Sequence, residues 1–170
     1  EPMGDIVVKS SSLKATIVKK EEIPSVIDEL PILMVAASLA KGRTIFEGVS
    51  ELRVKETDRI RSMSRNLKKM GASITVFSAT SRGGSAKHFG GKTAGTERIV
   101  IRGIKQLKAT RVRSFGDHRT AMSMIVAGLA ASGKASIDDI SCISKSFPNF
   151  ISLLDTLMNR RLTERSDVSR

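Results

Sequence analysis

One pattern occurs twice in the chain, and this repeat limits the folds that the chain can adopt. The stretch DELPILMVAASLAKGRTIFEGVS begins at Asp28, and DHRTAMSMIVAGLAASGKASIDDIS begins at Asp117, about ninety residues later. Each stretch reads as an aspartate, an apolar helix that ends in Leu-Ala, a glycine, a short β-branched strand and then a serine. The sequence therefore predicts an α/β (α+β) domain with two strand-helix-strand-helix units.

Apolar periodicity predicts the elements within and around these units. Alternating or continuous apolar runs predict strands at residues 5–10, 15–19, 44–49, 73–78 and 98–103. Helical spacing predicts helices at residues 25–42, 56–71, 117–133 and 147–160. Residues 78–97 are rich in Gly, Ser and Lys without the glycine spacing of a phosphate-binding loop, so we expect a mobile hairpin or connecting loop with a solvated His88.

Length and cysteine content exclude several protein classes. A chain of 170 residues suffices for one compact domain. No apolar run approaches the ~18 residues of a membrane span. The single cysteine, Cys142, excludes an internal disulfide, fits a reducing cytoplasm and is expected to be a small buried residue. Position 1 is not a methionine, which suggests a piece of a longer chain.

The net charge of +12 and the pI near 10.4 favour anionic partners. Nucleic acid is the first class to consider. However, Tyr and Trp are absent, the Phe residues are scattered, and neither a zinc-ligand spacing nor a long basic run occurs. Small phosphorylated or carboxylated substrates explain the same excess of positive charge.

The stretch RVKETDR contains charges that conflict with a helix N-terminus. Carboxylates are stabilised at that end of a helix, whereas the cations Lys55 and Arg59 are not. In one interpretation this is an exposed helix start, capped by Thr57 or Asp58, in which Glu56 pairs with Arg59. In the other, an anion binds beside the two cations.

Three further stretches combine charge with a predicted helix start. In GDHRTAM, Asp117 is a good N-cap that would place His118 and Arg119 in the first turn, and an exposed Arg119 paired with Asp117 is the simpler alternative. In IDELP, Asp28 caps or opens a helix. In SKSFPNF, Lys145 precedes a helix whose first turn would hold Pro148, and taken alone it is a surface lysine.

Taken together, these stretches predict one site. All of them lie at strand-to-helix junctions of the repeated unit, so parallel helices would bring their N-termini together. Helix dipoles with Lys and Arg side chains would make a strong anion site. Asp28 and Glu56 would then be available as a base and an acid for proton transfer.

The stretches ELRVKETDRIRSM, GDHRTAMS and KSFPNF, with SVIDELPILMVAA before them, resemble the C-terminal part of the 5-enolpyruvylshikimate-3-phosphate synthase family over residues 5–158. This resemblance implies an inside-out α/β barrel-type domain of the enolpyruvyl transferase family, built from βαβαββ units. Residues 1–158 would supply about two units of one domain, namely 1–75 with a hairpin at 76–103, and 104–158. Residues 159–170 would form a polar tail.

The resemblance implies transfer of the enolpyruvyl group of phosphoenolpyruvate to the 5-hydroxyl of shikimate 3-phosphate, through a tetrahedral intermediate and with release of phosphate. It implies no metal and no organic cofactor. Asp28 would contact shikimate 3-phosphate and take the proton from its hydroxyl. Lys55 would also bind shikimate 3-phosphate, and Glu56 would protonate the methylene of phosphoenolpyruvate.

The resemblance also implies an anion-binding set. Arg59, Arg119 and Lys145 would bind phosphoenolpyruvate, and Asp117 and His118 would support Arg119. The N-terminal half of the family's chain is missing, so we expect the 170-residue chain to bind weakly and to have no turnover. The full-length protein is expected to be a cytoplasmic monomer.

Three alternatives remain. An enolpyruvyl transferase that acts on UDP-N-acetylglucosamine shares the fold by resemblance, but its motifs do not include VKETDR followed by DHR. A basic nucleic-acid-binding module would show an affinity that falls steeply with salt, and it gives no reason for Asp28 or Glu56. The third alternative is a non-catalytic remnant that keeps only the scaffold.

Overall fold

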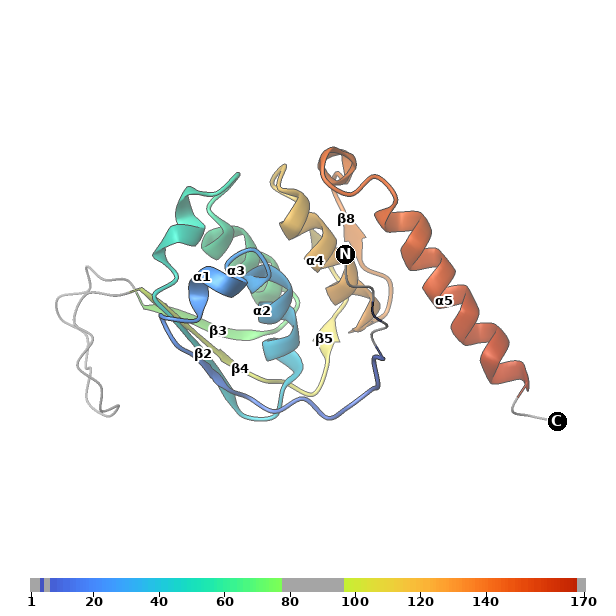
Figure 1. Cartoon of the computed structure of the whole chain (residues 1–170), viewed down its shortest axis with the longest axis horizontal. Coiled ribbons are helices and arrows are strands. Elements are labelled where there is room, and N and C mark those ends of the chain that lie inside the picture. Colours follow the sequence, from blue (N-terminus) through green and yellow to red (C-terminus); the bar gives the residue numbers. More distant parts are fainter. Residues whose placement is uncertain (1–3, 5–6, 78–96, 168–170) are drawn as a thin grey trace.

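The computed structural model of the chain describes residue 4, residues 7–77 and residues 97–167, with side chains up to residue 159. Its first half is a four-stranded sheet covered on one face by helices (Figure 1). The elements are β1 (Ile17–Val18), α1 (Ile23–Val26), α2 (Leu30–Leu39), β2 (Arg43–Glu47), the 3-10 helix η1 (Ser50–Val54), α3 (Arg59–Lys69), β3 (Ser73–Phe77) and β4 (Arg98–Arg102).

The topology of this half is one βαβαββ unit. The strand order in the sheet is β1-β2-β4-β3, in which β1 and β2 are parallel and the other neighbours are antiparallel. A parallel pair requires a crossover, and α2 provides it between β1 and β2. The first of the two predicted units therefore forms a complete four-stranded sheet.

The sheet buries one face only. Thr44 and Phe46 of β2 and Ile99 and Ile101 of β4 are buried on the side of the helices, and they alternate with residues that are partly or fully exposed. This period of two is typical of a sheet with one covered face. The strands lie outside and the helices inside, as the predicted inside-out arrangement requires.

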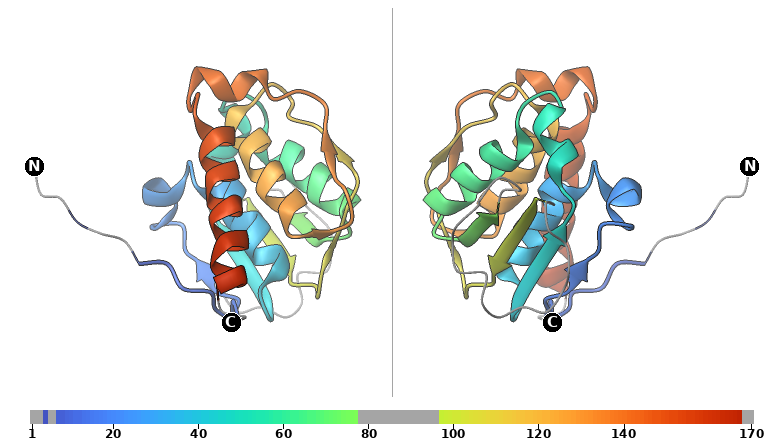
Figure 2. Two further views of the ribbon diagram at one scale, coloured as in Figure 1. Left: turned by 90° about the vertical axis from the view of Figure 1, so that its right-hand side faces the viewer. Right: turned by 90° about the vertical axis from the view of Figure 1, so that its left-hand side faces the viewer.

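The second half repeats the parallel strand-helix-strand arrangement with shorter strands. Its elements are β5 (Leu107–Lys108), β6 (Arg111–Val112), α4 (His118–Leu129), β7 (Ala131–Ser132), β8 (Ser136–Ile137), η2 (Ser141–Lys145) and α5 (Phe150–Asp167). Strand β5 pairs with β7 and β6 pairs with β8, both in parallel. Helix α5 extends away from the body of the protein (Figures 1 and 2).

One hydrophobic core joins both halves. Met34 of α2, Met63 and Leu67 of α3 and Met124 of α4 are at most 1% exposed and belong to the same buried cluster. The hydroxyls of Ser62 and Thr120, 3.2 Å apart, add a buried hydrogen bond between α3 and α4. Helices α2, α3 and α4 are therefore held together at the centre of the molecule.

Four of the five predicted strands are present, and the exception lies at the N-terminus. Residues 7–10 of the predicted strand 5–10 have no strand structure, and Val7 and Val8 there are 78% and 88% exposed. The predicted loop at 78–96, with His88, lies outside the described residues. Cys142 is buried, as predicted.

The predicted helices differ from the observed ones in their bounds. The expected helix 25–42 is divided into α1 and α2, because Pro31 in the first turn of α2 prevents a continuous helix through residue 27. Helix α4 ends at Leu129, since the next residues enter β7. Helix α5 runs to Asp167, seven residues beyond the expected end, through a segment of helix-forming Arg, Leu and Glu residues. None of the described helices is long and apolar enough to cross a membrane.

The close approach of Gly103 to α2 gives a test of this packing. A Cβ at Gly103 would lie 1.6 Å from the carbonyl oxygen of Ala40, a backbone atom that cannot move aside alone. We expect Gly103→Ala to lower the free energy of unfolding by at least about 2 kcal/mol, measured by urea denaturation. Gly4→Ala, which meets nothing within 4 Å, is the control. Equal stability of the two variants would contradict this packing.

Candidate active site

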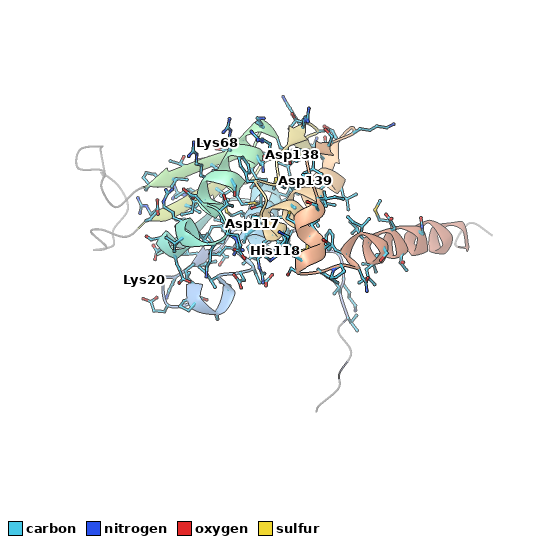
Figure 3. The ribbon with its side chains drawn as sticks, turned by 90° about the horizontal axis from the view of Figure 1, so that it is seen from above. Lys20, Lys68, Asp117, His118, Asp138 and Asp139 are labelled. Atoms are coloured by element: carbon cyan, nitrogen blue, oxygen red, sulfur yellow. The ribbon has the colours of Figure 1, made fainter. Side chains whose placement is uncertain are left out.

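Most of the predicted site residues lie at the N-terminal ends of α3 and α4 and in the turn before α2. Figure 3 labels Asp117 and His118 at the start of α4. Asp58 caps α3, since its Oδ1 accepts a hydrogen bond of 2.9 Å from the backbone N–H of Arg61. Asp117 caps α4, since its Oδ1 accepts one of 2.8 Å from the N–H of Thr120. Aspartate is among the best N-cap residues, so the sequence itself fixes where these two helices begin.

Arg59 is the centre of the site. Its side chain is 1% exposed and donates to carboxylates from three different segments. Nε donates to Oδ2 of Asp117 at 2.8 Å, Nη1 donates to Oδ1 of Asp28 at 3.1 Å, and Nη2 donates to Oε2 of Glu56. One guanidinium therefore joins Asp28, Glu56 and Asp117, which are 31, 3 and 58 positions away from Arg59 in the sequence.

The electrostatics of Arg59 combine two opposing effects. Burial disfavours its charge, but the hydrogen bond and the charge of Asp117 outweigh burial, with help from Glu56 and Asp28, so the net pKa of Arg59 is raised. Arg59 therefore remains a cation at every pH at which the protein is folded. Its three nitrogens, which the sequence predicts to hold an external anion, are occupied by the chain's own carboxylates.

Asp28 joins Arg59 to the second arginine. Nη2 of Arg119 lies 3.3 Å from Oδ2 of Asp28, and Nη1 donates to the backbone oxygen of Asp28 at 2.8 Å and to Oε1 of Glu29 at 3.1 Å. Asp28 does not cap α2, because Glu29 occupies the N-cap position and forms no side-chain cap bond. Arg119 does not pair with Asp117, because that carboxylate is bound by Arg59.

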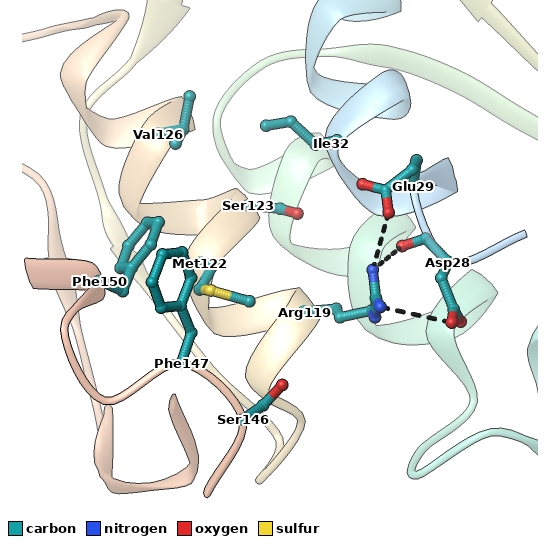
Figure 4. Close-up of a pocket in the computed structure, with 10 residues that line it drawn as sticks. All are labelled: Asp28, Glu29, Ile32, Arg119, Met122, Ser123, Val126, Ser146, Phe147 and Phe150. Carbon is teal, nitrogen blue, oxygen red and sulfur yellow. Dashed lines mark hydrogen bonds and ion pairs between the residues drawn. The ribbon is translucent and has the colours of Figure 1, made fainter. Parts of the chain in front are cut away.

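Arg119 faces a cavity of about 370 Å³ between α2, α4 and the start of α5 (Figure 4). Asp28, Glu29 and Arg119 form its charged side, and Phe147 and Phe150 form part of its apolar side. The Arg119 side chain is 28% exposed, whereas Arg59 is almost inaccessible. Arg119 is therefore the arginine that an anion entering this cavity can reach directly.

The remaining predicted residues lie around this cluster without joining it. Lys55 forms an ion pair of 2.7 Å with Glu51. His118 is the first residue of α4 and is half-buried, and Lys145 is the last residue of η2 and is exposed. Within the described part of the chain, neither the His118 side chain nor the Lys145 side chain forms a hydrogen bond or ion pair. Pro148 precedes α5 instead of lying in its first turn, because the helix begins at Phe150.

Sequence patterns did not identify the residues that hold the loop before α4. The side chain of Asn66 bonds both backbone groups of Arg113, at 2.7 and 3.0 Å, and Oδ1 of Asp138 accepts from the N–H of Ser114 at 2.8 Å. These bonds hold a tight turn in which Phe115 has a φ of 56°. Asn66 and Asp138 thus position Asp117, although no spacing in the sequence marks them.

No metal site is found in the part of the chain that the structure describes. Groups of three or more His, Cys, Asp or Glu side chains that could hold a metal ion are absent there. The carboxylates that do converge are already neutralised by Arg59 and Arg119. Carboxylates beside guanidinium groups are chemically suited to proton transfer next to a bound anion.

Comparison with known protein sequences identifies relatives of this chain. Residues 1–154 match the profile of the EPSP synthase (3-phosphoshikimate 1-carboxyvinyltransferase) family. A 3-phosphoshikimate 1-carboxyvinyltransferase of Geobacter sulfurreducens is 45% identical over 160 residues, which cover 94% of this chain and 33% of that protein. One of Petrotoga mobilis is 43% identical over 157 residues, covering 92% of this chain and 32% of that protein. The chain thus spans about a third of the length of these relatives.

Solved structures agree with the sequence relatives. A structure of EPSP synthase from Acinetobacter baumannii superposes with a TM-score of 0.69 and 34% identity, covering 85% of this chain and 30% of that one. A second structure of the enzyme from this organism gives a TM-score of 0.66 and 31% identity. The predicted fold class, an α/β domain of the enolpyruvyl transferase type, is therefore confirmed.

The buried pair of Arg59 and Asp117 gives a stability prediction. Asp117→Asn keeps a side chain that can cap α4 but removes the charge that compensates buried Arg59, so we expect a loss of about 3 kcal/mol in the free energy of unfolding. Asp58→Asn is the matched control: it also changes an N-cap aspartate paired with an arginine, but its partner Arg53 is 39% exposed. We expect a loss below about 1 kcal/mol for the control. Equal losses in denaturation experiments would contradict a special role for the buried pair.

The loop before α4 gives a pH prediction. Burial alone would raise the pKa of Asp138, but hydrogen bonds from the N–H groups of Ser114 and Asp139, and from Arg113, lower it below the usual aspartate value. The resulting stability is present above roughly pH 4 and is lost as the pH falls through the lowered pKa. We expect Asp138→Asn to unfold more easily near neutral pH and to show a shallower loss of stability below roughly pH 4 than the unchanged chain. Asp155→Asn, which removes an exposed carboxylate, is expected to follow the unchanged chain.

Proposed function

The chain belongs to the EPSP synthase family, and we propose that it forms part of an enzyme that transfers the enolpyruvyl group of phosphoenolpyruvate to the 5-hydroxyl of shikimate 3-phosphate. The products are 5-enolpyruvylshikimate 3-phosphate and phosphate. The observation that carries this proposal is the meeting of Asp28, Glu56 and Arg119 around buried Arg59. Because the chain spans about a third of its relatives, the substrates would also contact residues outside it.

Asp28 and Glu56 suit the two proton transfers of this reaction. Their side chains are 48% and 49% exposed, and each bonds a different Nη atom of Arg59, so one rigid group orients both. Ionised Asp28 takes the hydroxyl proton as the oxygen attacks C2 of phosphoenolpyruvate. Glu56 acts as the general acid that protonates the methylene carbon, and the tetrahedral intermediate forms. Glu56 then takes back a methyl proton as the C–O bond to phosphate breaks, and Asp28 returns the hydroxyl proton to the departing phosphate oxygen.

Arg119 suits the binding of phosphoenolpyruvate. It is partly exposed in the cavity and, among the described residues, is bound only by Asp28 and Glu29, which a carboxylate or phosphate could replace. Arg59 would reach the same anion once Glu56 or Asp28 turns away. Replacing Asp28 at Arg119 also frees a carboxylate oxygen to act as the base, so binding and proton transfer are coupled.

The other predicted residues complete the proposed site. Lys55 would give up Glu51 to bind shikimate 3-phosphate, and exposed Lys145 would turn toward phosphoenolpyruvate. Asp117 holds Arg59, and His118 opens α4 beside Arg119. We expect the complete enzyme to contain an N-terminal part of the same chain, and to act in the cytoplasm as a monomer without a metal or organic cofactor.

A chimera tests this function. The matching third of the Geobacter sulfurreducens relative is replaced by this chain, and the release of phosphate from phosphoenolpyruvate and shikimate 3-phosphate is measured. We expect turnover by the chimera and none by the 170-residue chain alone. Asp28→Asn and Glu56→Gln should each lower kcat by about 10²- to 10⁴-fold. Arg119→Gln should chiefly raise KM for phosphoenolpyruvate.

Controls separate this reaction from its alternatives. Lys69→Gln, at an exposed position of α3, should leave turnover unchanged. UDP-N-acetylglucosamine replaces shikimate 3-phosphate in a second assay, in which we expect no product. Transfer to UDP-N-acetylglucosamine, or full turnover by Asp28→Asn, would overturn the proposed reaction.

A further inference from the structure

The outer side of α3 carries positive charge at every solvent-facing position. These positions are Arg61, Arg65, Lys68 and Lys69, and all other residues of the helix are buried. Lys68 lies at the rim of the molecule, away from Asp117 and His118 (Figure 3). The functional site uses the opposite side of the same helix, where Arg59 is buried. The basic side of α3 therefore requires a separate explanation.

A cavity of about 380 Å³ lies on this side of α3. Arg53, Arg61, Arg65 and Lys68 line it together with Ser64, and Ile60 and Val76 add apolar surface. Arg53 is held in place by Glu97, to which its Nε donates at 2.9 Å, and by Asp58 at 2.7 Å. The cavity thus combines one guanidinium that is held in place with three exposed cationic side chains that can adjust to a ligand.

Ser64 contributes a hydrogen-bonding group that has no partner. The residue is 7% exposed, and its Oγ is the one buried side-chain polar atom without a hydrogen bond among the described residues. By contrast, the hydroxyl of Ser62, two positions earlier, contacts that of Thr120 at 3.2 Å. A buried hydroxyl without a partner is unfavourable, and an oxyanion in the cavity could accept its hydrogen bond once the flexible basic side chains move aside.

Arg53 is paired with Glu97 and Asp58, but the other three cations of this cavity have no acidic partner among the described residues. Arg61 lies in the first turn of α3, where the helix dipole opposes it, and Arg65 follows at i+4 as a like-charge neighbour. Within the described residues, none of Arg61, Arg65 and Lys68 forms an ion pair. Residues 78–96, which follow the strand that carries Val76, contain no Asp or Glu. The helix dipole accounts only for Lys68 and Lys69 in the last turn.

We propose that this cavity binds a small phosphate-bearing anion, at a site separate from the Arg59 cluster. Three uncompensated cations match the two negative charges of a phosphate better than the single charge of a carboxylate. Guanidinium groups and a hydroxyl are suitable donors to its oxygens. The apolar surface from Ile60 and Val76 leaves room for an organic group on the phosphate. This site is independent of the proposed enolpyruvyl transfer.

Titration of the isotopically labelled chain with inorganic phosphate at constant ionic strength tests the proposal. We expect backbone amide signals of Ser64 and Arg65 to shift with saturation. Arg61→Gln combined with Arg65→Gln should weaken binding by about tenfold or more. Ser64→Ala should weaken it by about two- to tenfold. Lys69→Gln, the matched control on the same helix outside the cavity, should change it by less than about twofold.

Further titrations distinguish this site from the Arg59 cluster and from nonspecific electrostatic attraction. Arg119→Gln should leave the signals of Ser64 and Arg65 responsive to phosphate. Equal weakening by Lys69→Gln and by the double substitution, or shifts confined to residues near Arg119, would overturn the proposal. Glycerol 3-phosphate is compared with inorganic phosphate. Tighter binding of the ester assigns the site to a phosphorylated metabolite, and equal binding assigns it to free phosphate.

Thermal unfolding provides an independent readout. Phosphate should raise the Tm of the unchanged chain more than that of the double variant. Removal of two like charges should itself raise the Tm without phosphate, so failure to fold is not expected. If the double variant does not fold, the phosphate affinity of Ser64→Ala is measured instead. An unchanged affinity of Ser64→Ala would also overturn the proposal.

Discussion

The structure depends on the buried pair of Arg59 and Asp117. Both side chains are at most 1% exposed, and transfer of two charges from water into the interior is favourable only when their hydrogen bonds are satisfied. Both oxygens of Asp117 accept a hydrogen bond, Oδ2 from Arg59 and Oδ1 from a backbone N–H in the first turn of α4. A single carboxylate therefore sets the start of α4 and ties it to α3. Loss of this pair would remove the ion-pair link between α3 and α4 at the point where the site forms.

The same pair explains why the site is neutralised by its own side chains. Arg59 has its charge stabilised by Asp117 before any ligand arrives, and Asp28 and Glu56 occupy its other nitrogens. An incoming anion must therefore compete with half-exposed carboxylates and not with water alone. Under the proposed reaction this competition is useful. The carboxylates that an anion displaces from the arginines are the groups that must then transfer protons.

Local chemistry made part of this arrangement predictable, and tertiary contacts determined the rest. The apolar periods predicted β2, β3 and β4, Asp117 predicted where α4 begins, and Asp58 was one of the two predicted caps of α3, because these signals act within a few residues. Strands β5, β6 and β7 have two residues each, too few for a period to be recognised, whereas the repeat predicted the short strand after Gly133, where β8 lies. The pairing of Glu56 with Arg59, three positions away, was predicted, but the distant partners of the arginines were not. Asp117 was expected beside Arg119, its neighbour in sequence, but it bonds Arg59, 58 positions away.

The two copies of the repeated unit differ in how well they support their part of the site. Helix α3 is followed by β3 and β4, and the sheet buries its apolar side, so Arg59 is held rigidly. In α5, by contrast, Leu153 and Leu157 are 49% and 63% exposed. Lys145, which matches Lys55 in the repeat, precedes this helix and is exposed as well. The first unit thus carries the preorganised part of the site, and the second contributes mainly through the N-terminal end of α4.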